Sequence, residues 1–216
     1  MKVLVACEYS GKVREAFRAL GHDAWSCDLL PADDGSAFHY QGSVLDILED
    51  GWDLMIGHPP CTYLCNSGVS WLHKIPERWD QMRDGAEFFK ALLNAPIPKI
   101  CIENPIMHKY AKEIIGENYT QLVQPYQFGH PESKATCFWL KGLEPLQETE
   151  NVKDQWQSLP KKEAQRLHML PPSKDRWKLR SETYQGIADA MAQQWGYFEE
   201  DDVCRNGKPI QECICC

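Results

Sequence analysis

The chain has 216 residues, 43% of them hydrophobic and 25% charged, which suffices for one globular core with a small appendage but not for two full domains. No run approaches the roughly 18 apolar residues that cross a bilayer, and the N-terminus has no signal-peptide pattern, so we expect an intracellular protein without a membrane partner. The formal net charge of −8 excludes a protein that coats nucleic acid unselectively, because such binding relies on clustered Lys and Arg.

The chain contains 10 cysteines, which are scattered irregularly through apolar and glycine-rich segments. This usage favours a reduced enzyme over a disulfide scaffold, so the expected compartment is the cytoplasm. Four of them, Cys204, Cys213, Cys215 and Cys216, lie near the C-terminus. Their spacing lacks the paired Cys-X-X-Cys elements of common structural zinc sites, and we expect no metal.

Short apolar runs alternate with helical patterns along the first 140 residues. Strands are expected at 3–7, 24–27, 54–57, 100–103, 121–125 and 136–140, and helices at 11–20 and 77–93. This alternation predicts an α/β fold whose mostly parallel sheet is covered by helices on both faces. Such sheets bind ligands beyond the carboxyl ends of their strands, so functional residues should follow the strands directly.

The periodicity weakens after residue 140. We expect 141–183 to be short and mostly irregular, 184–196 to form a final helix that packs back on the core 1–140, and 197–216 to be a flexible acidic tail. Between residues 153 and 180, eight basic residues stand against three acidic ones. This excess fits a docking face for an anionic partner, or a solvated loop that only offsets an acidic surface.

The segment DLMIGHPPCTYLCNSG, residues 53–68, ends an apolar strand in two prolines and Cys61. Proline fixes its own φ and keeps the preceding residue out of the helical region, so this loop is stiff and holds Cys61 at the ligand edge of the sheet. A thiolate there can attack an electrophilic carbon if a helix start or a cation favours deprotonation. The alternative is a small buried hydrophobic side chain.

A second apolar strand, in KICIENPIM at 99–107, brings Glu103 and Asn104 to the same edge. A carboxylate without function there would need to be solvated or paired. The alternative for Asn104 is an N-cap of a helix whose first residue is Pro105.

Together these residues resemble the cytosine-C5 DNA methyltransferase family. Its Pro-Pro-Cys element matches Pro59, Pro60 and Cys61, and its Glu-Asn element after the next strand matches Glu103 and Asn104. The resemblance covers 1–140 and returns in the final helix, and the chain is also similar to small phage-encoded proteins of this type. It implies a Rossmann-like, S-adenosylmethionine-dependent methyltransferase fold and, for a phage-encoded chain, the host cytoplasm.

The implied reaction transfers a methyl group from S-adenosylmethionine to C5 of cytosine in DNA. C5 becomes nucleophilic only after a thiolate adds to C6, which is the role implied for Cys61. Glu103 is the candidate acid for N3, a role for which a raised pKa is expected. The third implied catalytic residue, Lys134, stands where the family carries an arginine. In double-stranded DNA the target base must be flipped out of the stack, whereas in single-stranded DNA it is already accessible.

The resemblance also implies two sets of binding residues. The cofactor would contact Cys7, Glu8, Tyr9, Ser10, Gly11, Asp28, Leu29, Ser43 and Pro59, with Asp28 accepting hydrogen bonds from the ribose. DNA would contact Pro60, Asn104, Thr136, Arg176, Trp177 and Arg180, of which the last three lie in the short target-recognition segment 141–183.

Two alternatives follow from departures from the family pattern. Tyr9 replaces a glycine, Ser43 an aspartate, and Lys134 and Thr136 two arginines. These substitutions are also expected of a nucleic-acid-binding decoy or regulator that no longer methylates. The short recognition segment is equally compatible with a related C5 transferase that acts on RNA or on a free nucleotide.

Overall fold

The computed structural model describes residues 1–174 and 176–197, so the predicted tail lies outside the described residues apart from Tyr197. At its centre is a seven-stranded sheet in the order β3-β2-β1-β4-β5-β7-β6. The strands are β1 (Lys2–Ala6), β2 (Asp23–Asp28), β3 (His39–Gln41), β4 (Leu54–Gly57), β5 (Lys99–Asn104), β6 (Gln121–Val123) and β7 (Thr136–Lys141). Strands β1 to β5 are parallel, whereas β7 is antiparallel to both β5 and β6.

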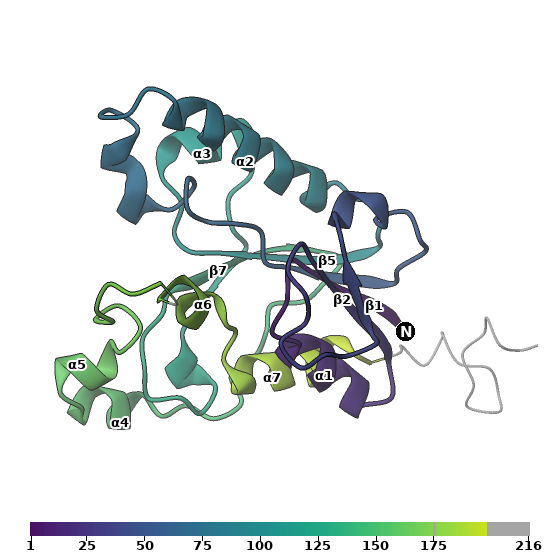
Figure 1. The fold of residues 1–216 in the computed structure, drawn as a ribbon. Helices are drawn as coiled ribbons and strands as arrows, with labels where there is room; N and C mark the ends of the chain where they lie inside the picture. The colour runs from purple at the N-terminus through teal and green to yellow at the C-terminus, as the bar shows by residue number, and fades with distance from the viewer. Residues whose placement is uncertain (175, 198–216) are drawn as a thin grey trace, which may run out of the picture.

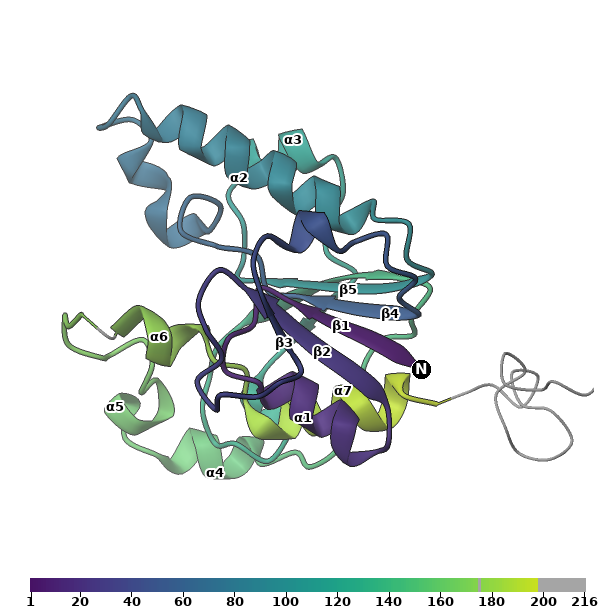
Figure 2. The same cartoon turned by 45° about the vertical axis from the view of Figure 1, so that its right-hand side comes forward.

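Helices cover both faces of this sheet (Figure 1). Helices α1 (Lys12–Ala19) and α7 (Gln185–Trp195) lie side by side on one face, and α2 (Arg78–Leu93) and α3 (Lys109–Ile115) pair on the other, as the turned view in Figure 2 also shows. Short 3₁₀ helices occupy loops at η1 (Val44–Asp46), η2 (Asn66–Trp71) and η3 (Pro125–Gln127). The arrangement confirms the predicted α/β class with a mostly parallel sheet between two helical layers.

Each face of the sheet carries its own hydrophobic core. In β1, Val3 and Val5 pack with Phe17 of α1, while Leu4 and Ala6 belong to the core beneath α2 and α3. All five side chains are fully buried. Burial on both faces explains why the central strands read as continuous apolar runs rather than as alternating patterns.

Two details of the predicted elements differ from the structure. The strand expected at 121–125 ends at Val123, because Pro125 opens η3. The short polar edge strand β3 carries no apolar pattern and was not predicted. In the segment 141–180 most described residues lie outside helices and strands, and the others include the short helices α4 (Lys153–Ser158), α5 (Lys161–Ala164) and α6 (Arg176–Ser181). None of the described helices has both the length and the apolar composition of a membrane span.

Candidate active site

The two segments that were singled out in the sequence meet at one edge of the sheet. Strands β4 and β5 are parallel neighbours, with Gly57 paired to Ile102. The chain leaves β4 at Gly57 and reaches Cys61 four residues later, while β5 carries Glu103 near its own carboxyl end. Strand pairing therefore brings the predicted nucleophile and the predicted acid to the same side of the molecule.

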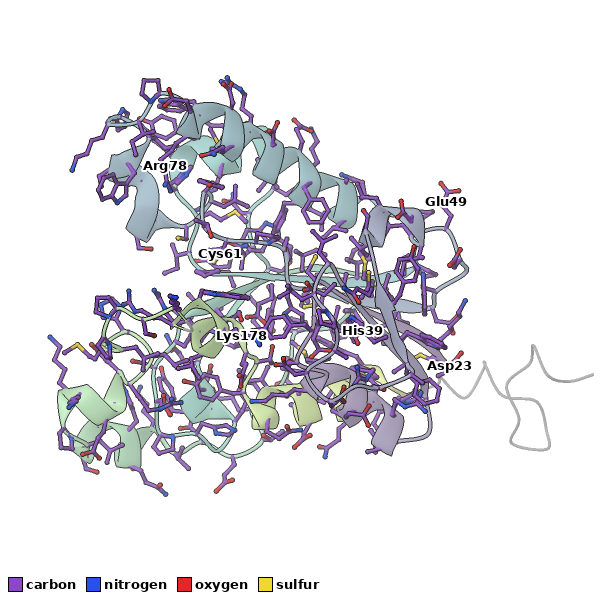
Figure 3. The ribbon with its side chains drawn as sticks, in the orientation of Figure 1. Asp23, His39, Glu49, Cys61, Arg78 and Lys178 are labelled. Carbon is purple, nitrogen blue, oxygen red and sulfur yellow. The ribbon has the colours of Figure 1, made fainter. Side chains whose placement is uncertain are left out.

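The loop after β4 is a tight turn around Cys61. The carbonyl oxygen of Cys61 accepts hydrogen bonds from the backbone N–H groups of Leu64 and Cys65, both at 3.0 Å. In Figure 3, Cys61 lies between the layer that carries Arg78 and the layer that carries Lys178. The side chain is only half-buried, so the alternative of a sealed core cysteine is wrong.

The thiol of Cys61 is hydrogen-bonded to a second cysteine, Cys65. That bond and burial raise the pKa of Cys61 well above its ordinary value, whereas the charge of Lys134 acts in the opposite direction. The same bond lowers the pKa of Cys65 to about 5 against the effect of burial, and the hydroxyl of Ser67, 3.1 Å from the Cys65 sulfur, assists. The contact between the two sulfurs therefore favours ionisation of Cys65 over ionisation of Cys61.

Glu103 forms a buried ion pair with His58. Nδ1 of His58 lies 3.1 Å from Oε2 of Glu103, and each side chain is 11% exposed. Burial raises the pKa of Glu103, but the contact with His58 and the charges of His58 and Lys134 outweigh it, so the net pKa is lowered. The raised pKa that was predicted for Glu103 is wrong, because the sequence did not reveal its cationic partner.

The pKa of His58 shifts in the opposite sense. Burial lowers it, but the contact with Glu103 and the negative charges of Glu103 and Glu8 outweigh burial and raise it above its ordinary value. Lys134 opposes this rise with its positive charge. The charge of Lys134 thus acts on His58 and on the two other predicted catalytic residues, Cys61 and Glu103.

Asn104 is 1% exposed, and neither polar atom of its side chain has a hydrogen-bond partner among the described residues. Buried side-chain amides without a partner are rare in native proteins, which makes Asn104 unusual among the buried residues. The alternative role as an N-cap is wrong, because α3 begins at Lys109 and His108 caps it.

Among the other predicted DNA contacts from the core, Pro60 is exposed, whereas Thr136 is 3% exposed and donates to the carbonyl of Lys134 at 3.0 Å.

The predicted cofactor residues divide into two groups. At the end of β2, Asp28 is half-buried and accepts a hydrogen bond from the Leu30 N–H at 2.9 Å, and Leu29 is 75% exposed. Ser43 caps η1 by accepting from the Leu45 N–H at 3.3 Å, and Pro59 is buried. These residues line the carboxyl ends of β2, β3 and β4, where a parallel sheet binds its ligand.

In the loop after β1, side chains turn into the protein rather than outward. Glu8 is 5% exposed and accepts from the Val13 N–H at 2.8 Å, so its carboxylate closes the N-terminus of α1. Cys7 has a φ of 59° and Gly11 a φ of 73°, and a Cβ at Gly11 would collide with the guanidinium of Arg14. The hydroxyl of the half-buried Ser10 likewise turns inward and contacts the Glu8 carboxylate at 3.4 Å.

The short helix α6 packs on this same loop through Tyr9. The rings of Tyr9 and Trp177 have centroids 5.9 Å apart, and the Tyr9 hydroxyl lies 3.0 Å from the hydroxyl of Ser181. Trp177 remains 53% exposed, Arg180 is exposed, and Arg176 donates to the carbonyl of His168 at 3.4 Å. Tyr9, where the family carries a glycine, therefore anchors the predicted recognition segment to the predicted cofactor loop.

Two site residues, His58 and Cys65, were missed in the sequence. Both lie in the segment that was singled out, three residues before and four residues after Cys61. The position of His58 directly after an apolar strand was an available signal, because polar residues there face the ligand edge. Nothing local indicated that the Cys65 thiol would turn toward Cys61.

No protein-family model and no curated protein matches this chain. Solved structures similar to it include a protein assigned as a DNA modification methyltransferase encoded within an E. coli prophage, at 17% identity over 74% of this chain with a TM-score of 0.44. The Entamoeba histolytica methyltransferase EhMeth is 17% identical over 70% of this chain, with a TM-score of 0.45. The S. pombe Dnmt2 methyltransferase is 18% identical over 72%, with a TM-score of 0.40. The chain spans about half the length of these structures, at 55%, 56% and 52%.

Proposed function

We propose that this protein transfers a methyl group from S-adenosylmethionine to C5 of cytosine in DNA, through a covalent bond between Cys61 and C6. The observation that carries the proposal is the convergence of Cys61 and Glu103 at the ends of paired strands, under the charge of Lys134. A nucleophile and a proton donor that meet beside one cation are the groups that activation of a pyrimidine ring requires.

The residues after β2 fit the adenosine half of the cofactor. Oδ1 of Asp28 accepts from Leu30, so Oδ2 is the oxygen that would accept from a ribose hydroxyl, and the exposed Leu29 offers an apolar surface for a purine ring. Ser43 and Pro59 would complete this side, and the backbone of 7–11 would face the methionine half. When bound, the cofactor would supply an electrophilic methyl group for C5.

The described side chains account for the remaining steps. Cys61 passes its proton to Cys65 and adds to C6 of the target cytosine, while Glu103 protonates N3. This addition makes C5 nucleophilic. After methylation the C5 proton leaves to water or another base, and elimination of Cys61 restores the aromatic ring. Lys134 stabilises the negative charge that Cys61 and Glu103 carry at different steps.

The substrate side of the proposal rests on segment 141–183. Its excess of basic residues suits the phosphate backbone, and the half-exposed ring of Trp177 suits stacking on an unpaired base. We therefore propose DNA with a flipped or single-stranded cytosine as the substrate.

A specific observation favours a second candidate, a nucleic-acid-binding protein that does not methylate. The side chains of Glu8 and Tyr9 are committed to protein contacts, and the resting Cys61 holds its proton. Such a protein would bind DNA or RNA through the same segment without transfer to C5.

The test is parallel incubation of the full chain and methyl-labelled S-adenosylmethionine with cytosine-containing DNA, with RNA and with free cytosine nucleotides, followed by nucleoside analysis. Label in 5-methylcytosine that is abolished by Cys61→Ser supports the proposal. Cys65→Ser is the matched control, because it changes a neighbouring thiol and should slow transfer without abolishing it. Tight DNA binding with no labelled product from the wild type would instead establish the second candidate, and label that appears only in RNA or in free nucleotides would establish a related C5 transferase.

A further inference from the structure

His58 is a buried histidine that the proposed methyl-transfer steps do not use. Its Nδ1 lies at ion-pair distance, 3.1 Å, from Oε2 of Glu103, and neither ring nitrogen has an aligned hydrogen-bond partner among the described residues. Three charged groups face the imidazole from three different elements: Glu103 from β5, Glu8 from the loop between β1 and α1, and Lys134 from the segment before β7. Two anions and one cation around a buried imidazole favour its charged form.

We propose that His58 is the proton-holding partner of Glu103, so that its imidazolium supplies the proton that Glu103 delivers to N3 of the target cytosine. This inference rests on the proposed methyl transfer and deepens it. The contact with His58 lowers the pKa of Glu103 and favours its ionised form, so Glu103 needs a source for the proton that it delivers. Imidazole is the side chain that exchanges a proton near neutral pH, whereas the Lys134 ammonium donates to the carbonyl oxygen of Glu182 at 3.1 Å.

Over one turnover, the proton that His58 supplies is returned to it. The proton moves from Nδ1 of His58 to Oε2 of Glu103, and the carboxyl protonates N3 as the Cys61 thiolate forms its bond to C6. After C5 has lost its own proton, the bond between Cys61 and C6 breaks, and the proton on N3 returns through Glu103 to His58. The pair ends as it began, and the only proton released is the one from C5.

The proposal gives His58 a role that a packing residue would not have. A buried imidazole that only filled space would be replaceable by a neutral side chain of similar size at every pH. An imidazole that stores the proton makes transfer depend on its own titration, so activity should fall as pH rises through the midpoint of His58.

The first test needs no methyl transfer. In the full-length chain labelled with ¹⁵N, imidazole titrations are followed by NMR, and the His58 signal is assigned by its loss in His58→Gln. We expect a midpoint above 6.5 in the wild type and a lower midpoint in Glu103→Gln, because that variant removes the negative charge beside the imidazole. A midpoint at or below 6.5, or one that Glu103→Gln leaves unchanged, overturns the proposal.

The second test compares pH profiles of kcat/KM for methyl transfer. His58→Gln should lose about 10²-fold at pH values below the wild-type midpoint of His58, and the two profiles should converge as the pH rises above that midpoint, where the wild type has lost the stored proton as well. The control His73→Gln changes an exposed histidine and should keep the wild-type profile. A loss that is equal at every pH overturns the role of His58 alone, whereas a wild type that transfers nothing overturns the proposed function itself and the delivery step with it.

Discussion

Replacing Glu8 by alanine removes the carboxylate that closes the N-terminus of α1. The side chain is 5% exposed, and it accepts from the backbone N–H groups of Val13 at 2.8 Å and Arg14 at 3.3 Å. Each amide left without an acceptor costs about 1–3 kcal/mol, and loss of the negative charge at the helix N-terminus adds about 0.3–1 kcal/mol. Because water can enter the space left by the side chain, we expect a total loss of about 2–4 kcal/mol in the free energy of unfolding.

Glu8→Gln is the matched control for this prediction. The amide oxygen can still accept one of the two bonds, and burial raises the pKa of Glu8 above its ordinary value despite the opposing effect of His58. Removing that charge therefore costs little, and we expect a loss of about 1 kcal/mol or less. Urea denaturation, followed by tryptophan fluorescence and circular dichroism, measures the free energy of unfolding of both variants. The comparison is valid if their m-values are equal. Equal losses in the two variants would refute the capping role.

Three further predictions concern charge and exposure. Because the pKa of Cys65 is lowered to about 5, iodoacetamide at about pH 6 should modify Cys65 before any other described cysteine, as read by peptide mass spectrometry; faster labelling elsewhere contradicts this. Trp177→Ala should weaken binding of single-stranded DNA about tenfold in fluorescence anisotropy, since a stacked base contributes about 1–3 kcal/mol. Leu179→Ala, on the same helix and 45% exposed, should bind normally, and an equal loss would count against stacking. The lowered pKa of Glu103 removes stability as pH falls below 4.5, and the raised pKa of His58 removes it as pH rises above 6.5. The difference in unfolding free energy between wild type and His58→Gln should therefore be largest between these values, and a flat difference contradicts the ion pair.

The central strands and the position of Cys61 could be predicted from the sequence because both follow from local patterns. Strands such as β4 are buried on both faces, so they read as short apolar runs with clear ends. Parallel neighbours then place their following residues at one edge, which is how Cys61 and Glu103 could be predicted to lie at the same edge of the sheet. Only the rule of strand pairing was needed for that part of the site.

The protonation states could not be predicted, because they depend on contacts between distant segments. His58 and Glu103 are separated by 45 positions in the chain and meet only through the pairing of β4 with β5. The short helices of 141–183 were missed for a similar reason. Helix α4 contributes Trp156, which stacks on Tyr126 at 4.9 Å, and helix α6 is held by the contact of Trp177 with Tyr9. Helices of this length depend on tertiary packing rather than on intrinsic propensity.

The proposed covalent chemistry is tested most directly by trapping. DNA that carries 5-fluorocytosine cannot lose its C5 substituent as a proton, so an enzyme that has added to C6 and methylated C5 stays attached. With S-adenosylmethionine present, we expect a denaturant-stable protein–DNA adduct whose peptide mass maps to Cys61, which persists in Cys65→Ser and disappears in Cys61→Ser. Binding of DNA and cofactor without any adduct, or an adduct that maps to Cys65, would contradict the assignment of Cys61 as the nucleophile.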